Sequence, residues 1–339
     1  MGKQKTMKAM QISSPGADFQ LVEIDIPQPG QDKVLIRVEA CGVCHGESVL
    51  KDGRFPGIQY PRIPGHEVIG IIDKLGSESH RWKIGDRVGV GWHGGHCHQC
   101  LPCRTGSFGA CEESVVTGLT TDGGYAEYMV ARMEALAPIP DGLDPVIAAP
   151  ILCAGRTTYG ALKQSSAKGG DLVAVQGFGG LGHLAVQYAK KMGFRTAVIS
   201  RGRDKEELAL KLGADHYIDS CSQDPAKELT ALGGAKLILA TAPCSEAMNQ
   251  VIGGLGRRGE MIIVTFANEP LMISPAMLMR GEKSISGWVG GNPDDALRFS
   301  ALTGVMPMVE VFPLEDASLA YERMMTAKVR FRAVLKISG

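Results

Sequence analysis

Short apolar runs separated by glycine and proline characterise the first 150 residues of the chain. Examples within residues 7–131 are MKAMQI, KVLIRVEA, EVIGIIDKLG, DRVGVGW and YAEYMVA. Short runs of this kind, bounded by turn-forming residues, are typical of β-strands, and several of them in succession are typical of sandwiches and barrels. The pattern therefore predicts an all-β, barrel-like domain in this part of the chain.

The pattern changes near residue 145. The segment PVIAAPILCAGRTTYGALKQ predicts a helix, and from Asp171 onward apolar strands alternate with helical stretches, beginning with a helix over 181–193. The predicted strands cover residues 171–176, 195–200, 214–219, 235–241, 259–265 and 283–288. Strands that alternate with helices predict an α/β domain with a doubly wound parallel sheet.

The end of the chain is expected to return to the first domain. A further helix is predicted over 294–304, and the strand-like run FRAVLKIS closes the sequence. A chain of 339 residues suits two domains better than one core. The predicted limits are 1–151 for the β-domain, 152–286 for the parallel-sheet domain and 287–339 for the C-terminal return.

The composition narrows the possible partners and the location. The chain has 36 basic and 36 acidic residues without a block of like charge, so we expect neither nucleic acid nor a membrane surface as a partner. No apolar run approaches the roughly 20 residues that span a bilayer. The start, MGKQKTMKAM, lacks the apolar segment of a secretory signal. We therefore expect a cytoplasmic protein.

The cysteines are clumped along the chain. They lie at positions 41 and 44, at 97, 100, 103 and 111, and at 153, 221 and 244. A disulfide scaffold is typical of short secreted chains. Clumped cysteines in a long chain without a secretory signal favour thiolate metal ligands instead.

A glycine-rich turn in VAVQGFGGLGHLAVQ has the G-x-G-x-x-G spacing. It follows a predicted strand and opens a predicted helix, the context in which this motif binds the pyrophosphate of a dinucleotide. The helix N-terminus offers free N–H groups to the phosphates. A turn without a ligand is the alternative interpretation. The predicted contact residues are Gly177, Gly179, Gly180, Leu181 and Gly182.

The end of the second strand of this domain indicates which nucleotide is bound. An acidic residue there would bind the ribose hydroxyls of NAD(H), but the sequence has Ser200, followed by Arg201, Arg203 and Lys205. Arginine forms strong contacts with phosphate, so we predict NADP(H) in preference to NAD(H). A solvated basic turn, partly neutralised by Asp204, is the alternative.

A second cysteine group has the spacing C-x2-C-x2-C-x7-C. Four thiolates can form a closed tetrahedral zinc site, which would hold a long loop in place. Iron–sulfur ligation and paired disulfides are the competing interpretations. The nearby His93, His96 and His98 are interpreted as surface polar residues, because four thiolates already complete a tetrahedron. The predicted structural zinc ligands are Cys97, Cys100, Cys103 and Cys111.

A catalytic zinc site needs three protein ligands and one free position. The motif PGHEVIG supplies His66 with Glu67 beside it, and PILCAGRTTYG supplies Cys153. The third ligand is Cys41 or Cys44, between which the residues alone do not decide.

The sequence resembles the zinc-dependent alcohol dehydrogenases of the medium-chain dehydrogenase/reductase superfamily over essentially its whole length. The motifs that carry the resemblance are GVCH, PGHE, the four-cysteine loop, GDRV, DGGYAEY, CAG-x-TTY and GFGGLGHLAVQ-x-AK-x-MG. The resemblance implies a GroES-like β-barrel catalytic domain, a Rossmann cofactor domain, and a catalytic zinc ion in the cleft between them.

The resemblance also assigns roles to residues. It implies Cys44, His66 and Cys153 as the ligands of the catalytic zinc, with Glu67 next to the metal. Cys41 is then expected to be a packed residue, and a redox pair of Cys41 with Cys44 is the alternative.

The resemblance further places His45 near the cofactor pyrophosphate, with a plain surface histidine as the alternative. Thr157, four residues after Cys153, is expected to contact the nicotinamide ring. Trp92 is interpreted as a wall of the substrate pocket or as a core residue.

The implied activity is hydride transfer between NAD(P)(H) and a primary alcohol or aldehyde. The implied protein is a homodimer or homotetramer with two zinc ions per chain, and its substrate is a small molecule. A polyol dehydrogenase, a zinc-free quinone reductase and a catalytically impaired scaffold that binds zinc and nucleotide are the alternatives.

The sequence departs from the family pattern near the first zinc ligand. Gly46 stands where a threonine or serine hydroxyl usually begins a proton relay, and Val49 stands where a histidine often ends it. Glu47 replaces the aspartate that usually orients the zinc-bound histidine. We expect activity to be retained, with the proton leaving through water and His45 or Ser48.

Overall fold

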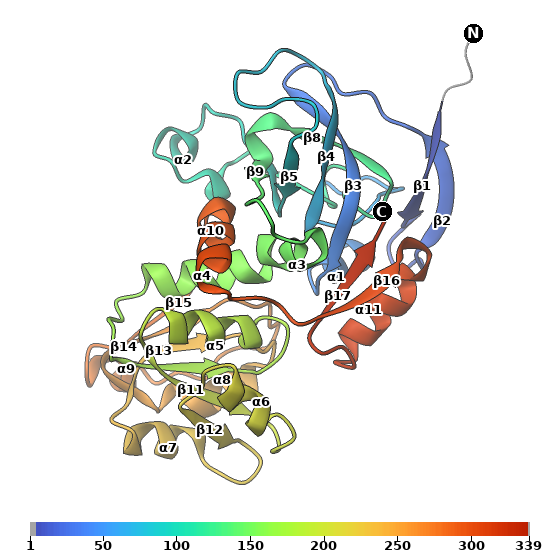
Figure 1. The fold of residues 1–339 in the computed structure, drawn as a ribbon. Helices are drawn as coiled ribbons and strands as arrows, with labels where there is room; N and C mark the ends of the chain where they lie inside the picture. Colours follow the sequence, from blue (N-terminus) through green and yellow to red (C-terminus); the bar gives the residue numbers. More distant parts are fainter. Residues whose placement is uncertain (1–4, 338–339) are drawn as a thin grey trace. The chain divides into compact units, whose positions relative to one another are not determined.

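The computed structural model describes residues 5–337 and divides into two compact units, each described here by itself (Figure 1). Unit 1 contains the chain up to Cys153, Pro293–Ala301, and the chain from Pro307 onward. Unit 2 contains Ala154–Asn292 and Leu302–Met306. The predicted domain limits begin at residue 1 and end at residue 339, and residues 1–4 and 338–339 lie outside the described residues.

Unit 1 is built mainly from antiparallel strands, as the pattern of short apolar runs predicts. Its main sheet has the order β16-β17-β3-β4-β5-β9, with β8 also paired to β3, and β1 pairs with β2 and β6 with β7 in two small sheets. The strands are β1 (Thr6–Gln11), β2 (Gln20–Asp25), β3 (Lys33–Val43), β4 (Val68–Leu75), β5 (Arg87–Val90), β6 (His93–Gly95), β7 (Val115–Val116), β8 (Tyr128–Arg132), β9 (Leu136–Pro138), β16 (Val309–Pro313) and β17 (Arg332–Lys336).

Strand β17 brings the end of the chain back to the β-domain. It pairs antiparallel with β3, Ala333 opposite Val43, so that residues almost 300 positions apart in the sequence become neighbours (Figure 1). The predicted return of the C-terminal strand is therefore observed. The helices of unit 1 are α1 (Glu47–Lys51), α2 (Leu101–Arg104), α3 (Pro145–Ala148), α11 (Ala317–Met325) and most of α10 (Pro293–Thr303), with 3-10 turns η1 (Phe108–Ala110), η2 (Met133–Ala135), η3 (Ala149–Leu152) and η4 (Leu314–Asp316).

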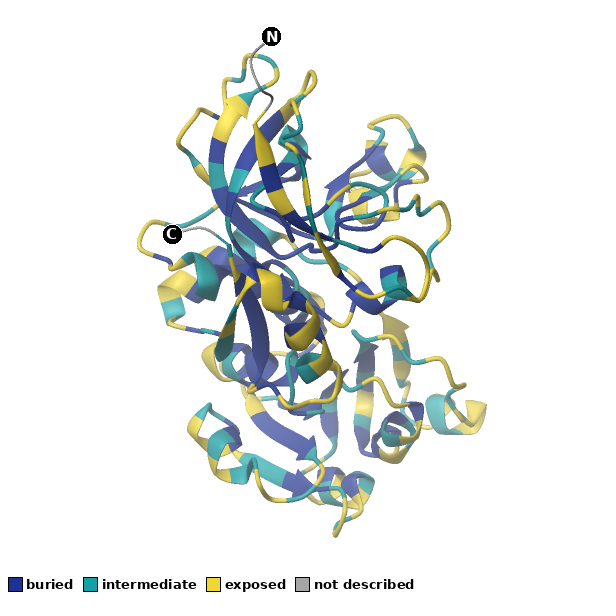
Figure 2. Ribbon diagram, turned by 90° about the vertical axis from the view of Figure 1, so that its right-hand side faces the viewer, coloured by how far each residue is buried: buried dark blue, intermediate teal, exposed yellow. Residues whose placement is uncertain are grey.

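Unit 2 is a doubly wound parallel sheet of the order β12-β11-β10-β13-β14-β15. Its strands are β10 (Leu172–Gln176), β11 (Arg195–Ser200), β12 (His216–Asp219), β13 (Ala235–Ala240), β14 (Leu255–Ile263) and β15 (Ser284–Gly287). Its helices are α4 (Ala154–Gln164), α5 (Gly182–Lys191), α6 (Glu206–Lys211), α7 (Pro225–Ala231), α8 (Ser245–Ile252) and α9 (Pro275–Met279). The central strands are buried nearly throughout (Figure 2), as expected for a parallel sheet covered on both faces.

One predicted element is divided in the structure. The helix expected over 145–164 consists of α3, η3 and α4, with Cys153 between η3 and α4 at φ −121° and ψ −74°. Pro150 has no N–H to donate, so a continuous helix would lose a hydrogen bond there. The break leaves the Cys153 side chain on a turn rather than in a helix.

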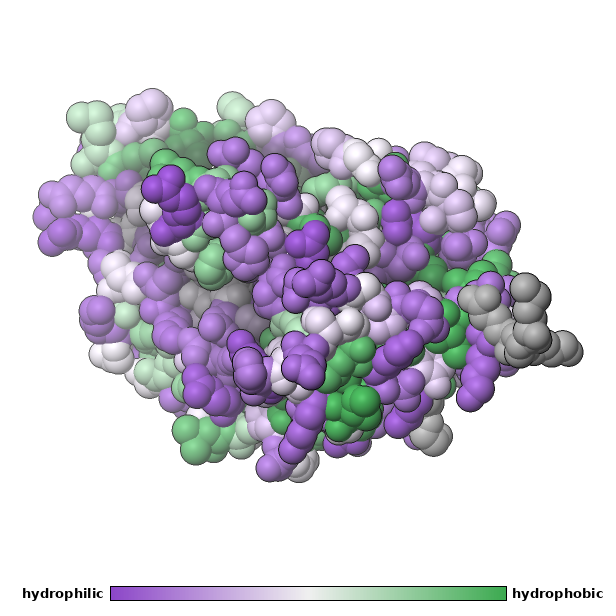
Figure 3. All heavy atoms as spheres, turned by 90° about the horizontal axis from the view of Figure 1, so that it is seen from above, coloured by the Kyte–Doolittle hydropathy of each residue, from purple (hydrophilic) through white to green (hydrophobic). Residues whose placement is uncertain are grey.

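In the view of Figure 3, hydrophilic side chains cover most of the surface, with smaller groups of apolar side chains among them. Within residues 5–337, no helix has both the length and the apolar character to cross a bilayer.

Candidate active site

Four potential metal ligands from separate loops converge in unit 1. Cys44 follows β3, His66 and Glu67 precede β4, and Cys153 follows η3. One donor atom from each lies within 4.8 Å of the others, and the Sγ atoms of Cys44 and Cys153 are 3.7 Å apart. Zn–S bonds of about 2.3 Å in a tetrahedron separate two sulfurs by roughly 3.8 Å. The two cysteines are therefore spaced for a single ion, and this group contains Cys44 and not Cys41.

Two buried polar atoms of this group have no hydrogen-bond partner among the described residues. They are Nε2 of His66 and Oε2 of Glu67, on side chains that are 2% and 0% exposed. Buried polar atoms ordinarily have a partner, and a cation between the four donors would satisfy both. Two thiolates, an imidazole and a carboxylate are ligands that zinc prefers. The residues present therefore fit a zinc ion.

The contact between the two sulfurs shifts the pKa values of the two thiols in opposite directions. The hydrogen bond with Cys153 lowers the pKa of the Cys44 thiol well below its usual value, and the same bond raises the pKa of the Cys153 thiol. Cys44 is thus favoured as a thiolate, which is the form of cysteine that binds a metal.

Glu47 fixes the orientation of His66. Its Oε1 lies 2.9 Å from Nδ1 of His66, and its Oε2 accepts a hydrogen bond of 2.6 Å from the N–H of Cys44. A carboxylate on Nδ1 leaves Nε2 free to coordinate a metal. Glu47 therefore orients His66 as the aspartate of the family pattern would, although its side chain is one methylene longer.

Arg332 is a site residue that the sequence analysis missed. It lies on β17 and is 3% exposed, and its Nη2 donates hydrogen bonds to Glu67 Oε1 and to the carbonyl of Val43. Burial raises the pKa of Glu67 to about 7, against the opposing effect of Arg332. The sequence shows only an arginine at the start of an apolar strand, and this pattern does not indicate that Glu67 is its partner.

Gly42 and Gly46 leave room for neighbouring side chains. A Cβ at Gly42 would overlap Oε2 of Glu67, so a larger residue would displace that carboxylate. A Cβ at Gly46 would lie 3.0 Å from the ring of His66 and 3.1 Å from the ring of Trp92. The two rings pack edge to face, 4.9 Å between centroids. Trp92 therefore occupies the space next to the missing hydroxyl, and it lies at the site rather than only in the core.

The four-cysteine loop forms a second compact donor group. All four sulfurs lie within 4.8 Å of one another, with 4.0 Å between Cys97 and Cys103 and 3.9 Å between Cys100 and Cys111. These separations fit one tetrahedral ion with bonds of about 2.3 Å. All cysteines within residues 5–337 are free thiols, so paired disulfides are not the arrangement of this loop.

Backbone N–H groups point at the sulfurs of this loop. Cys97 Sγ accepts from the N–H groups of Gln99 and Cys100 at 3.5 and 3.4 Å, and Cys111 Sγ accepts from Glu113 at 3.3 Å. The N–H of Cys100 is the main cause that lowers the pKa of Cys97 to about 7. The loop is therefore folded to stabilise thiolates.

The glycine-rich turn joins β10 to α5 in unit 2. Gly177 has φ +97°, and a Cβ at Gly182 would overlap the carbonyl of Gly177, so both positions require glycine. A Cβ at Gly179 would meet nothing within 4 Å, which leaves the backbone accessible to a ligand. These are the roles that a dinucleotide-binding turn demands of its glycines. The turn therefore fits the pyrophosphate of a dinucleotide, with Gly180 and Leu181 between the second and third glycines.

The loop after β11 contains the residues expected to select the nucleotide. Ser200 ends the strand and Arg201 is exposed, as the sequence predicts. Lys205 directly precedes α6, and Arg203 pairs with Glu206 at 3.1 Å. The nearby Asp219 accepts the N–H of Gly202 at 2.7 Å and so holds the loop.

The remaining predicted residues lie on defined elements. His45 is exposed in the turn before α1, and Thr157 lies half-buried on α4.

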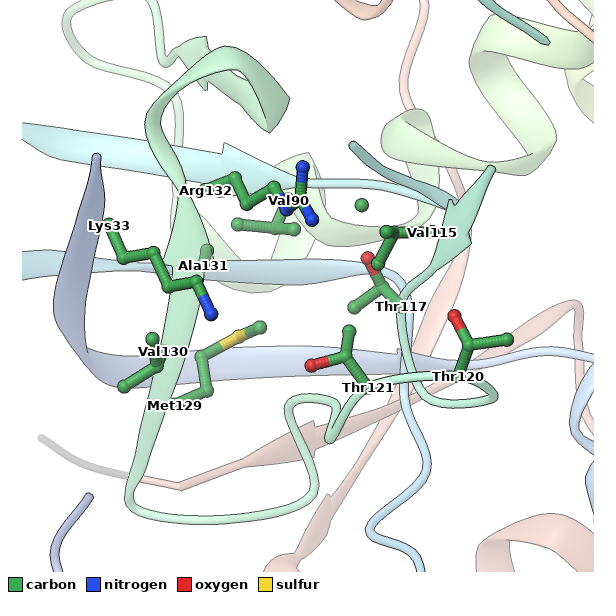
Figure 4. A pocket seen from close by; sticks show the side chains of 11 residues that line it. Lys33, Val90, Val115, Thr117, Thr120, Thr121, Met129, Val130, Ala131 and Arg132 are labelled. Atoms are coloured by element: carbon green, nitrogen blue, oxygen red, sulfur yellow. The ribbon is translucent and has the colours of Figure 1, made fainter. Parts of the chain in front are cut away.

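Unit 1 contains a cavity of about 210 Å³ (Figure 4). Lys33, Arg132 and the threonines Thr117, Thr120 and Thr121 are among the residues that line it. None of the predicted zinc or nucleotide residues is among them. The reaction is therefore not assigned to this cavity.

Comparison with known proteins decides the family. The domain family "Alcohol dehydrogenase GroES-like domain" matches residues 30–141, and "Zinc-binding dehydrogenase" matches residues 180–304. The alcohol dehydrogenase notN of Aspergillus sp. (strain MF297-2) is 43% identical over 338 residues, covering 99% of each chain. The chain belongs to the zinc-type medium-chain dehydrogenases/reductases.

Solved structures of medium-chain dehydrogenases agree with this placement. CAD from Helicobacter pylori, complexed with NADP(H), superposes with a TM-score of 0.87 at 28% identity, over 98% of each chain. A cobalt- and zinc-bound alcohol dehydrogenase from Pyrobaculum aerophilum has a TM-score of 0.87 at 27% identity, covering 99% of this chain and 100% of the other.

The family membership confirms the predicted fold class and activity. The chain is a zinc- and NAD(P)-dependent alcohol dehydrogenase with GroES-like and Rossmann domains, and it acts on small alcohols or aldehydes.

Proposed function

We propose that this dehydrogenase interconverts primary alcohols and aldehydes with NADP(H), at a zinc ion held by Cys44, His66 and Cys153. The observation that carries the proposal is the buried donor group in which His66 Nε2 and Glu67 Oε2 have no other partner among the described residues. When bound, the zinc supplies Lewis acidity and the nicotinamide carries the hydride. The protein's own residues hold these groups and exclude water.

Charged side chains around the ligands set their geometry. Glu47, with its side chain 1% exposed, holds His66 through Nδ1 and the backbone N–H of Cys44 through its second oxygen. Arg332 donates a hydrogen bond to Oε1 of Glu67, which leaves Oε2 of the same carboxylate available to the donor group. We propose that Glu67 stabilises the ligand set from beside the metal.

The proton of the alcohol needs a route that does not use residue 46. We propose that ordered water carries it to His45 or Ser48. The exposed position of His45 supports this route. Ser48 Oγ accepts a hydrogen bond of 3.2 Å from Arg54 Nη2, so its own O–H remains able to donate.

We further propose a second, structural zinc ion at Cys97, Cys100, Cys103 and Cys111, giving two per chain. The sulfur separations and the N–H groups directed at the sulfurs support it. Iron–sulfur ligation is the less suitable alternative, because four sulfurs within 4.8 Å enclose one ion rather than a cluster.

The presence of two donor groups argues against a zinc-free quinone reductase. Cys153 argues against a polyol dehydrogenase, because such enzymes often have glutamate at that position.

A homo-oligomer is proposed, either a dimer or a tetramer. Strand β15 ends the sheet of unit 2 with an unpaired edge among the described residues, and Phe266, Met272 and Met279 are exposed in the same unit. An open sheet edge is a surface on which a second copy of the chain can add its own strand.

The predicted cytoplasmic location stays a proposal, supported by free cysteines throughout residues 5–337. The domain limits 1–151, 152–286 and 287–339 stay a proposal too, supported by the antiparallel and parallel sheets on either side of the first limit.

The test of this function is turnover by the purified protein with its zinc quantified. We expect two zinc ions per chain and reduction of aliphatic or aromatic aldehydes, faster with NADPH than with NADH. Two zinc ions with NADH preferred would contradict the cofactor preference alone. Two zinc ions per chain without turnover of any aldehyde would favour the catalytically impaired scaffold. The missing hydroxyl at Gly46 would then be the expected cause.

Arg201→Ala is expected to reduce the preference for NADPH. A charge-assisted hydrogen bond contributes about 1.5–3 kcal/mol, so kcat/KM for NADPH should fall roughly 10- to 100-fold. The value for NADH should change little, because it lacks the 2′-phosphate. Arg195→Ala, at the opposite end of β11, is the matched control and should leave both values unchanged. Equal losses for both cofactors in Arg201→Ala would contradict the assignment.

A further inference from the structure

Three histidines and a glutamate form a cluster that neither zinc group uses. His93 lies on β6, His96 and His98 lie in the loop that follows, and Glu134 lies on η2. His96, His98 and Glu134 each place one donor atom within 4.8 Å of the other two. The prediction that these histidines are surface polar residues is wrong for His96, which is only 6% exposed.

His96 is held in position from several sides. Its ring stacks on Phe108 with 4.2 Å between centroids and lies 4.1 Å from the ring of His98. Its Nδ1 is 3.2 Å from Nε2 of His93, so these two nitrogens share a hydrogen bond. A metal-binding histidine typically has its second nitrogen engaged in this way. Nε2 is therefore the ring nitrogen of His96 that we assign to a metal ion.

His98 and Glu134 complete the group from the surface. His98 has φ +62°, a conformation that residues other than glycine adopt infrequently. Its Nε2 lies 3.9 Å from Oε1 of Glu134, and the two side chains are 63% and 23% exposed. Ligands around a tetrahedral ion lie roughly 3.4 Å apart when the bonds are about 2.0–2.1 Å. A small rotation of the exposed His98 side chain is enough to bring its Nε2 to that spacing from Glu134.

We propose that His96, His98 and Glu134 bind a divalent transition-metal ion, at a site separate from both cysteine-containing groups. Two imidazoles and a carboxylate suit zinc, cobalt, nickel or copper, and water would complete the coordination. His93 acts as a positioning residue through the Nδ1 atom of His96.

This site is expected to bind metal more weakly than the cysteine groups. Arg132 Nη1 lies 3.5 Å from Oε1 of Glu134 and competes with a cation for that carboxylate. His98 must also lose side-chain freedom on binding, because it is exposed.

The test is a titration of the zinc-loaded, full-length enzyme with Co²⁺, followed by calorimetry and visible absorption. We expect one added equivalent with weak ligand-field bands and without the intense thiolate-to-cobalt bands that cysteine ligation would produce. No added equivalent, or binding only with thiolate bands, would overturn the proposal.

Variants locate the added ion. His98→Asn and Glu134→Gln should abolish its binding, and His93→Gln should weaken it roughly 10- to 100-fold, as loss of an outer partner does. His80→Asn, an exposed histidine elsewhere in unit 1, is the matched control and should bind Co²⁺ like the parent. All of these variants should keep their cysteine-bound zinc. Equal Co²⁺ affinity in His98→Asn and His80→Asn would show that the cluster is not the site.

Discussion

Cys44→Ala is expected to remove one zinc ion per chain and nearly all turnover. Its sulfur lies 3.7 Å from that of Cys153 and belongs to the group with His66 and Glu67. A metal ion that acts as a Lewis acid contributes several kcal/mol to the transition state. Each 1.36 kcal/mol is a factor of ten, so kcat should fall on the order of 10³-fold or more. The measurements are zinc content and steady-state turnover with NADPH and an aldehyde.

Cys41→Ala is the matched control for this experiment. Cys41 is also fully buried and lies three positions earlier, but its thiol faces the carbonyl of Gly42 at 3.6 Å and lies in the apolar core of unit 1. The control should keep two zinc ions and most of the activity, with a modest loss of stability from the cavity. If Cys41→Ala loses the zinc and Cys44→Ala does not, the ligand assignment is wrong.

A sequence predicts a site most directly where the chemistry is concentrated in a short motif. The spacing of the four-cysteine loop and of the glycine-rich turn depends on neighbouring residues, and the structure folds both segments compactly around the expected atoms. The convergence of Cys44, His66 and Cys153 came from the family resemblance, since no local pattern places residues more than 100 positions apart. The sheets of both units follow from the change in hydrophobic periodicity near residue 145.

Contacts that depend on the tertiary fold have no signal in the sequence. The pairing of Arg332 with Glu67 arises only because β17 lies beside β3. The effect of Gly46 likewise depends on Trp92, which approaches from a different loop. The burial of His96 depends on Phe108 stacking over it, which the spacing of the histidines does not reveal.

Arg332→Met is expected to destabilise the protein strongly. The substitution leaves the carboxylate of Glu67, which is 0% exposed, without its cationic partner. Breaking a buried ion pair by removing one member typically costs about 3–5 kcal/mol, because the other charge remains buried. At roughly 2–4 °C per kcal/mol for a unit of this size, the midpoint of thermal unfolding should be some 6–20 °C lower. The measurement is the unfolding midpoint at a fixed scan rate.

A second substitution separates the loss of charge pairing from the loss of packing. Glu67→Gln in the Arg332→Met background removes the unpaired charge, so it should restore a substantial part of the lost stability. Arg298→Met is the control, because Arg298 is largely exposed and its ion pair with Asp295 is of the surface kind that contributes about 0–1 kcal/mol. If the double variant is no more stable than Arg332→Met alone, the charge-pairing explanation is wrong. Arg332 then stabilises the sheet by its packing between β17 and β3, and the metal ion, rather than Arg332, compensates the charge of Glu67.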